Sequence, residues 1–283
     1  SAIVHTKFPP DSYLAGRMKV KKRAFLYPNC ELIARVGLNI LSNPVKHIQA
    51  VARINRALLQ LQKTRGVVKK YFDILTASPK GAWKVISYEK DYNLGNLSVF
   101  LQKRTPTILQ KWQIADYLFE ALANMHAQKI YHRNFHPDHV LLHQEEGSEK
   151  IEAALTGLSD CWIESDSSEE KKFYYNLFNP NYIAPEIAAC HEKGVLPKIK
   201  RLPLADSWRL GFVLYYLWTY GKHPPEMPFD NGPLQNKYLL QKAASPSSAP
   251  IGRPEDKQSM KWILWNLLQY EPNRRLTVGQ AWL

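Results

Sequence analysis

Histidines gather in one stretch of this 283-residue chain, where imidazoles could bind a metal ion or exchange protons. Five of the nine histidines lie between residues 126 and 143. Their spacing could suit a zinc site, for which the candidate ligands are His132, His136, His139 and His143. No cysteine or second histidine cluster completes a set of ligands, so we expect no metal ion there.

Positive charge is concentrated at the start of the chain. The net charge of +13 comes from 38 lysines and arginines against 25 acids, and residues 1–72 hold 14 of these basic side chains but only Asp11 and Glu31. We expect this part to bind an acidic protein surface or an active enzyme rather than a nucleic acid, because no RNA-binding or zinc-finger motif accompanies it. The candidate partner-binding residues are Arg53, Arg56, Lys69 and Lys70.

These groups must be positioned by a strand-rich first part and a helical second part. Runs of β-forming residues bounded by turn residues predict strands over 18–20, 24–27, 31–38, 71–75 and 83–87. Apolar residues at helical spacing predict helices over 45–63, 107–127, 211–220 and 260–268. The chain is therefore expected to be an α+β protein, with a basic strand-rich unit over 1–88 and a helical unit over 89–283.

Other sequence features concern the setting of the chain. No apolar run reaches 18 residues, so no membrane span is predicted. The three cysteines form no C-x-x-C pair, which favours a reducing, cytoplasmic compartment. The chain stops inside an amphipathic stretch without a C-cap, as a domain cut from a longer protein would. The acidic stretch 165–170 is interpreted as a loop kept soluble by its charge.

Several motifs occur together in one order. The stretch Ile130-Tyr-His-Arg-Asn-Phe-His-Pro-Asp-His-Val-Leu-Leu142 resembles the catalytic loop of eukaryotic-type protein kinases. Further matches are Tyr182-Ile-Ala-Pro-Glu186, Asp206-Ser-Trp-Arg-Leu-Gly211 and Glu271-Pro-Asn-Arg-Arg-Leu-Thr277. The resemblance implies the bilobal kinase fold, in which a small antiparallel-sheet N-lobe with one helix precedes a larger, mainly helical C-lobe.

The same resemblance implies a set of structural residues. Within the catalytic loop these are His132 and Arg133. Glu186 is expected to pair with Arg275, and Asp206 to accept hydrogen bonds from the catalytic-loop backbone. Losing one partner of such a buried pair typically costs about 3–5 kcal/mol.

At the positions that the family uses for catalysis, this chain carries other residue types. Asn134 stands at the position of the catalytic aspartate and can orient a hydroxyl but cannot accept its proton. His136 aligns with the loop lysine and His139 with the metal-binding asparagine. A neutral imidazole is a poor ligand for Mg²⁺, which prefers oxygen.

The remaining catalytic parts are replaced or missing too. Aligning Leu155-Thr-Gly157 with D-F-G places Leu155 at the metal-binding aspartate, whereas a slipped alignment would use Asp160-Cys-Trp162. Arg35 stands for the phosphate-pairing lysine. No acid lies between Leu32 and Phe72 to pair with it, and the region before Arg35 lacks a glycine-rich loop.

These replacements favour a kinase-like domain without catalytic activity, a pseudokinase, which is not an enzyme and acts as a scaffold or allosteric protein-interaction module. No cofactor is expected, beyond a weak, metal-independent binding of ATP. One alternative is an atypical active phosphotransferase that uses Asp160 with remodelled metal binding. The other is a basic module that binds nucleic acid or phosphate.

Overall fold

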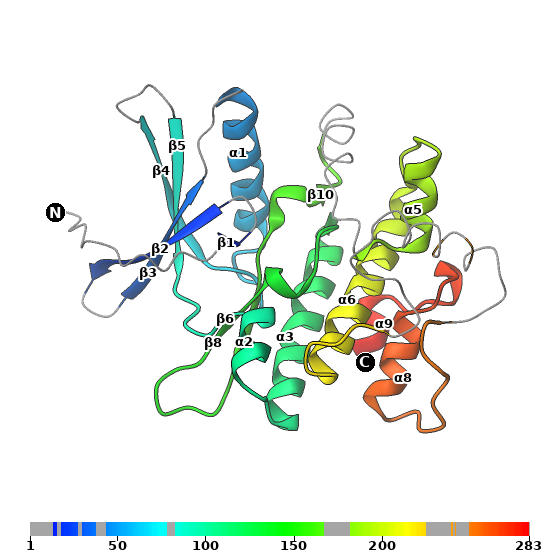
Figure 1. The fold of residues 1–283 in the computed structure, drawn as a ribbon. Coiled ribbons are helices and arrows are strands. Elements are labelled where there is room, and N and C mark those ends of the chain that lie inside the picture. Colours follow the sequence, from blue (N-terminus) through cyan, green and yellow to red (C-terminus); the bar gives the residue numbers. More distant parts are fainter. Residues whose placement is uncertain are drawn as a thin grey trace.

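The computed structural model describes residues 14–15, 18–27, 30–37, 44–77, 83–166, 182–224, 239, 241 and 249–282. A small sheet with one long helix beside it adjoins a larger body of helices (Figure 1). The position of Arg35 in a strand is described, and its side chain lies outside the described part of the chain.

The sheet of the first part has five strands in the order β1-β2-β3-β5-β4. They span Leu14–Ala15 (β1), Met18–Tyr27 (β2), Cys30–Gly37 (β3), Lys70–Ala77 (β4) and Trp83–Lys90 (β5). All described neighbours are antiparallel, and Arg35 in β3 lies between Val20 and Ser87. Helix α1, Pro44–Gln60, begins at a proline, which lacks only an N–H that the first turn leaves unused.

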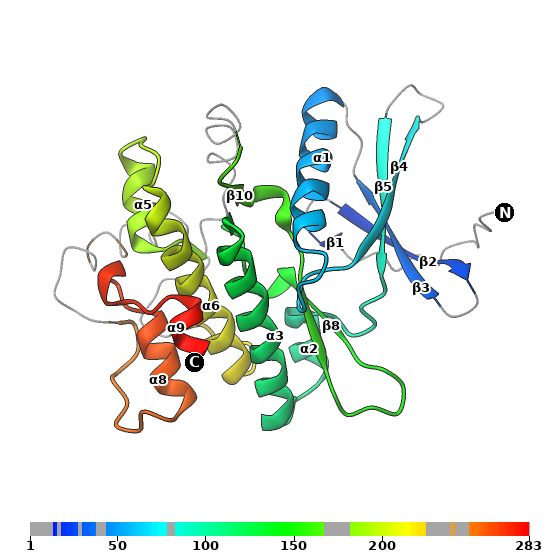
Figure 2. The same cartoon turned by 180° about the vertical axis from the view of Figure 1, so that it is seen from behind.

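The second part is built mainly on helices (Figures 1 and 2). They are α2 (Leu97–Lys103), α3 (Ile108–Ala127), α5 (Pro185–Glu192), α6 (Leu202–Trp218), α8 (Met260–Leu267) and α9 (Val278–Trp282). A capping box between Thr107 and Gln110 sets the start of α3. The core between α3 and α6 includes Ile114, Leu118 and Leu210, whose exposed fraction is 0%.

Short elements between β5 and α5 surround the catalytic loop. Three strands pair in the order β6-β8-β9, namely Gly95–Asn96, Val140–His143 and Glu152–Leu155. Two more, β7 (Ile130–Tyr131) and β10 (Trp162–Ile163), flank the loop as an antiparallel pair. Single 3-10 turns lie at Pro137–His139 (η1) and Leu158–Asp160 (η2).

The observed architecture confirms the predicted α+β class, with small antiparallel sheets and a larger helical part. The helix predicted over 211–220 instead begins at Leu202, because Pro203 in its first turn and the polar residues after it fit a helix start that apolar spacing does not signal. The unit boundary between residues 88 and 89 stays a prediction. Among the described residues, no helix combines the length and apolarity that crossing a bilayer requires.

Candidate active site

Asp206 fixes the backbone of the catalytic loop through hydrogen bonds. Its carboxylate, fully buried in α6, accepts hydrogen bonds from the backbone N–H groups of His132 and Arg133, both at 2.8 Å, and contacts His126 Nε2 at 3.0 Å. Burial by itself would raise the pKa of Asp206, but these donors lower it below its usual value. Arg133 has a φ of 63°, and the two hydrogen bonds at this turn hold its left-handed backbone in place.

A second buried charge pair joins α5 to the end of the chain. The Arg275 guanidinium donates to both carboxylate oxygens of Glu186, at 2.6 and 3.1 Å. The Arg275 side chain is fully buried and also donates to the backbone carbonyls of Gln269 and Leu204. This bidentate geometry leaves few of its donors unsatisfied, as a buried guanidinium requires.

Asn134 and Asp160 meet at the centre of the loop. Asn134 Nδ2 donates to Asp160 Oδ2 at 2.6 Å. Asn134 Oδ1 is buried and has no hydrogen-bond partner among the described residues. Asp160, in the turn η2, is only half buried. The carboxylate of Asp160 and the side-chain amide of Asn134 therefore lie together where the family resemblance places the catalytic aspartate.

The loop histidines pack as a stack of rings. The ring centroids of His136 and His139 are 3.9 Å apart, and Tyr182 stacks on His136 with 5.6 Å between centroids. His139 Nδ1 lies 2.6 Å from the backbone oxygen of Asn134 and therefore donates to it. Burial lowers the pKa of His132 to about 4 and that of His136 to about 2, and it lowers the pKa of His139 as well. All three rings are neutral at physiological pH.

The metal positions of a kinase do not fit Mg²⁺ here. Leu155, at the D-F-G aspartate in one alignment, is fully buried and pairs with Val140 in β8. His139 uses one ring nitrogen for the backbone of Asn134, and it packs against Gly157 so closely that an added Cβ would collide with the ring. Within the described residues, no three histidine, cysteine or acidic side chains gather closely enough to hold a metal ion.

Asp166 ties helix α1 to the segment after the catalytic loop. Its fully buried carboxylate accepts from Arg53 Nε at 2.7 Å and from Arg56 Nη2 at 3.0 Å. Arg53 also donates to the backbone oxygens of Cys161 and Ser159. Helix α1 contains no acid. In this ion pair the helix supplies the basic residue and the segment near the site supplies the acid, whereas kinase catalysis uses a glutamate of the helix and a lysine of the site.

This geometry corrects the expected basic surface. Arg53 is only 2% exposed, because it is the buried partner of Asp166, and Lys70 is largely buried against Asp73 at 2.7 Å. The interpretation of residues 165–170 as a solvated loop is wrong for Asp166, since its side chain is fully buried. Arg56 stays half exposed and Lys69 exposed.

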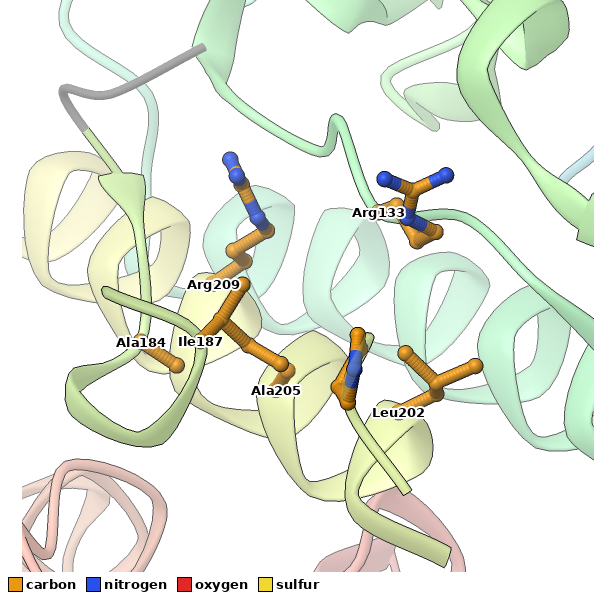
Figure 3. Close-up of a pocket in the computed structure, with 7 residues that line it drawn as sticks. Arg133, Ala184, Ile187, Leu202, Ala205 and Arg209 are labelled. Atoms are coloured by element: carbon orange, nitrogen blue, oxygen red, sulfur yellow. The ribbon is translucent and has the colours of Figure 1, made fainter. Parts of the chain in front are cut away.

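Asp166 and Arg209 are not among the site residues that the sequence predicts. A signal for Asp166 existed, since buried basic residues on an acid-free helix need a counter-charge from elsewhere. Arg209 had no such signal. It is 3% exposed, and burial lowers its pKa to about 10. Figure 3 shows it extending from α6 at the edge of a small cavity that Arg133 also lines. The other walls of this cavity are Ala184, Ile187, Pro197, Leu202 and Ala205.

Three features together define a protein-kinase-like domain. Asp206 accepts hydrogen bonds from the backbone of the catalytic loop, Glu186 pairs with Arg275, and a small sheet-containing part adjoins a larger helical part. The family model for the protein kinase domain matches residues 71–282, which is most of the chain. The chain therefore belongs to the protein kinase domain family.

Known relatives are protein kinases of several eukaryotes. Over 174 residues the chain is 23% identical to serine/threonine-protein kinase RAD53 of Saccharomyces cerevisiae. The matched region covers 60% of this chain and 20% of that protein. It is 27% identical over 183 residues to the human phosphorylase b kinase gamma catalytic chain, liver/testis isoform, covering 64% and 39% respectively. It is also 27% identical to serine/threonine-protein kinase nekl-2 of Caenorhabditis elegans, covering 59% and 41%. The chain thus spans less than half the length of these relatives.

These names correct one expectation. The prediction that this chain is not an enzyme is wrong, because relatives across the matched region are named serine/threonine protein kinases or a kinase catalytic chain. Residue types at the motif positions leave out neighbouring groups: Asn134 donates to the carboxylate of Asp160 at 2.6 Å.

Proposed function

We propose that this domain is an atypical phosphotransferase that transfers a phosphoryl group to serine or threonine hydroxyls, with Asp160 as its carboxylate. The contact of 2.6 Å between Asn134 Nδ2 and Asp160 Oδ2 carries this proposal. It brings a carboxylate to the loop position where Asn134 itself cannot accept a proton. The names of the relatives support the substrate class.

The two residues divide one task. Asn134 donates from Nδ2 to Asp160 Oδ2 and thereby orients the carboxylate toward the substrate hydroxyl. The hydroxyl oxygen forms its bond to the γ-phosphorus of ATP while the bond to the bridging oxygen of ADP breaks. The hydroxyl proton passes to the carboxylate of Asp160, which its half-buried position keeps reachable.

The donor nucleotide is proposed to bind weakly and without a metal ion. Leu155 and His139 stand at the metal positions, and neither presents an oxygen. A thermal unfolding titration tests this part: ATP should raise the unfolding temperature slightly, and equally with EDTA or Mg²⁺. A rise that occurs only with Mg²⁺ would contradict it.

The transfer itself is tested with ATP labelled at the γ-phosphate, the purified domain and a serine- and threonine-containing protein. We expect slow labelling, and a loss of about 100-fold in Asp160→Asn, the typical size of a lost general base. Asp138→Asn is the matched control, because Asp138 is a carboxylate of the same loop that is 53% exposed and faces His136 instead. No labelling by the unaltered domain, or equal labelling by Asp160→Asn, would overturn the proposal.

We also propose that the domain binds an acidic protein partner through Arg56, near the end of α1, and Lys69, just before β4. The observation that favours this is the pair Arg56 and Lys69, which stay at the surface when Arg53 and Lys70 turn inward. Polyglutamate is a suitable probe, with single-stranded DNA as the competing ligand. Binding to polyglutamate should weaken as salt rises and in Arg56→Gln/Lys69→Gln. Tighter binding to the DNA with a steep salt dependence would indicate a nucleic-acid module instead.

A further inference from the structure

The connection between α5 and α6 exposes aliphatic and basic side chains together. It runs as Lys193-Gly-Val-Leu-Pro-Lys-Ile-Lys-Arg201 and ends in the 3-10 turn Ile199–Arg201 (η4). Val195 is 48% exposed, Leu196 41% and Ile199 39%. Exposed aliphatic side chains are ordinary when they stand alone, but three within five residues form a patch.

The charge of this segment differs from that of the part around it. Four basic side chains lie within these nine residues, and the one adjoining acid is Glu192. Lys193, Lys198 and Lys200 are exposed, and none of them makes an ion pair with the described residues. Residues 73–283 as a whole are nearly neutral, with 24 basic and 23 acidic side chains, so the basic charge is local.

The backbone of the segment is held in place. Val195 N–H donates to Cys190 O and Arg201 N–H to Lys198 O, at 3.0 and 2.8 Å. Pro197 is buried against the cavity of Figure 3, while the residues on both sides of it are exposed. The aliphatic and basic side chains are therefore presented outward from a fixed support.

We propose that this segment, residues 193–201, docks the domain onto an anionic membrane surface. Aliphatic side chains enter the boundary between headgroups and acyl chains, while lysines beside them bind anionic headgroups. Each signal alone gives weak binding, and the two together give stable attachment. Ile199 lies between Lys198 and Lys200, with Val195 and Leu196 just before them, so apolar and basic side chains are intermixed as the boundary between acyl chains and anionic headgroups requires.

The experiment measures sedimentation of the purified domain with phosphatidylcholine vesicles, with and without phosphatidylserine. We expect binding only with phosphatidylserine, and a loss of about 25-fold in Lys198→Gln/Lys200→Gln, roughly fivefold for each lysine. Lys103→Gln/Lys261→Gln removes the same charge from two exposed positions outside the segment and should change little. Leu196→Ser/Ile199→Ser should weaken binding by about tenfold while the lysines remain.

Thermal unfolding of each variant shows whether it is folded. We expect every variant to be folded, because the replaced side chains are exposed. Absence of binding to phosphatidylserine vesicles would overturn the proposal. So would equal losses in the two lysine variants, which would assign the binding to net charge. A loss of polyglutamate binding in Lys198→Gln/Lys200→Gln as large as the loss of vesicle binding would mean that the partner of the segment is an acidic protein.

Discussion

The buried charges that support the catalytic loop and the side chains that face the reacting groups differ in how strictly they follow the kinase pattern. Asp206, Glu186 and Arg275 keep the residue types and contacts that the family resemblance implies. In the catalytic loop, by contrast, Asn134 stands where the family has an aspartate, and His139 stands where it has an asparagine. Loss of any one of these supporting charges would leave a buried group unpaired. Asn134 and His139 instead form hydrogen bonds to Asp160 and to the loop backbone, which other polar residue types could also make.

The largest effect should come from removing the support. Asp206→Ala leaves two backbone N–H groups and His126 without their acceptor in a fully buried site. We expect a loss of about 4–5 kcal/mol in the free energy of unfolding. Urea titration measures it, and Asp138→Asn, an exposed carboxylate, should change it by less than about 0.5 kcal/mol. A small change in Asp206→Ala would mean that the loop holds its own shape.

A smaller loss is expected where the site joins helix α1. Asp166→Asn removes the counter-charge of Arg53, which stays buried, while Arg56 can turn to solvent. We expect about 3 kcal/mol by urea titration. Asp116→Asn is a matched control, because its pair with Arg65 is exposed and is worth less than about 1 kcal/mol. Equal effects of the two variants would show that the Asp166 pair is solvated.

The packing of His139 against Gly157 can be tested by rescue. Gly157→Ala places a Cβ against the imidazole at a φ of 82°, and we expect a loss of about 2 kcal/mol. The double variant Gly157→Ala/His139→Ala should recover part of it, because the collision is removed and only the backbone strain remains. Strictly additive losses would mean that His139 does not occupy this space.

The smallest effect, when counted per pH unit, should be the dependence of the free energy of unfolding on pH. Burial lowers the pKa of His132 to about 4 and of His136 to about 2 in the folded state, from about 6.5 when unfolded. The unfolded chain therefore takes up protons first, and stability falls as pH drops below 6.5. Each histidine contributes up to about 1.4 kcal/mol per pH unit, for His132 until about pH 4.

His136→Phe should reduce this slope, since the ring that stacks on Tyr182 is kept while the titrating group is lost. The measurement is urea titration at a series of pH values between about 4 and about 7, the window in which both lowered pKa values act on stability. A slope that does not change would mean that His136 is as accessible to protons as in an unfolded chain.

The sequence by itself determined the family and the α+β class, because motif order, turn residues and apolar spacing are local properties that survive in a linear reading. It also showed that Asn134 is neutral and that helix α1 carries no acid. Only the tertiary structure decided which charges are buried and what they contact. Arg53 lies 113 residues from Asp166, so no periodicity links them, and Asp160 reaches Asn134 only through the turn after β9. Burial and pairing depend on the distances that folding creates, and these set both the energies and the chemistry of the site.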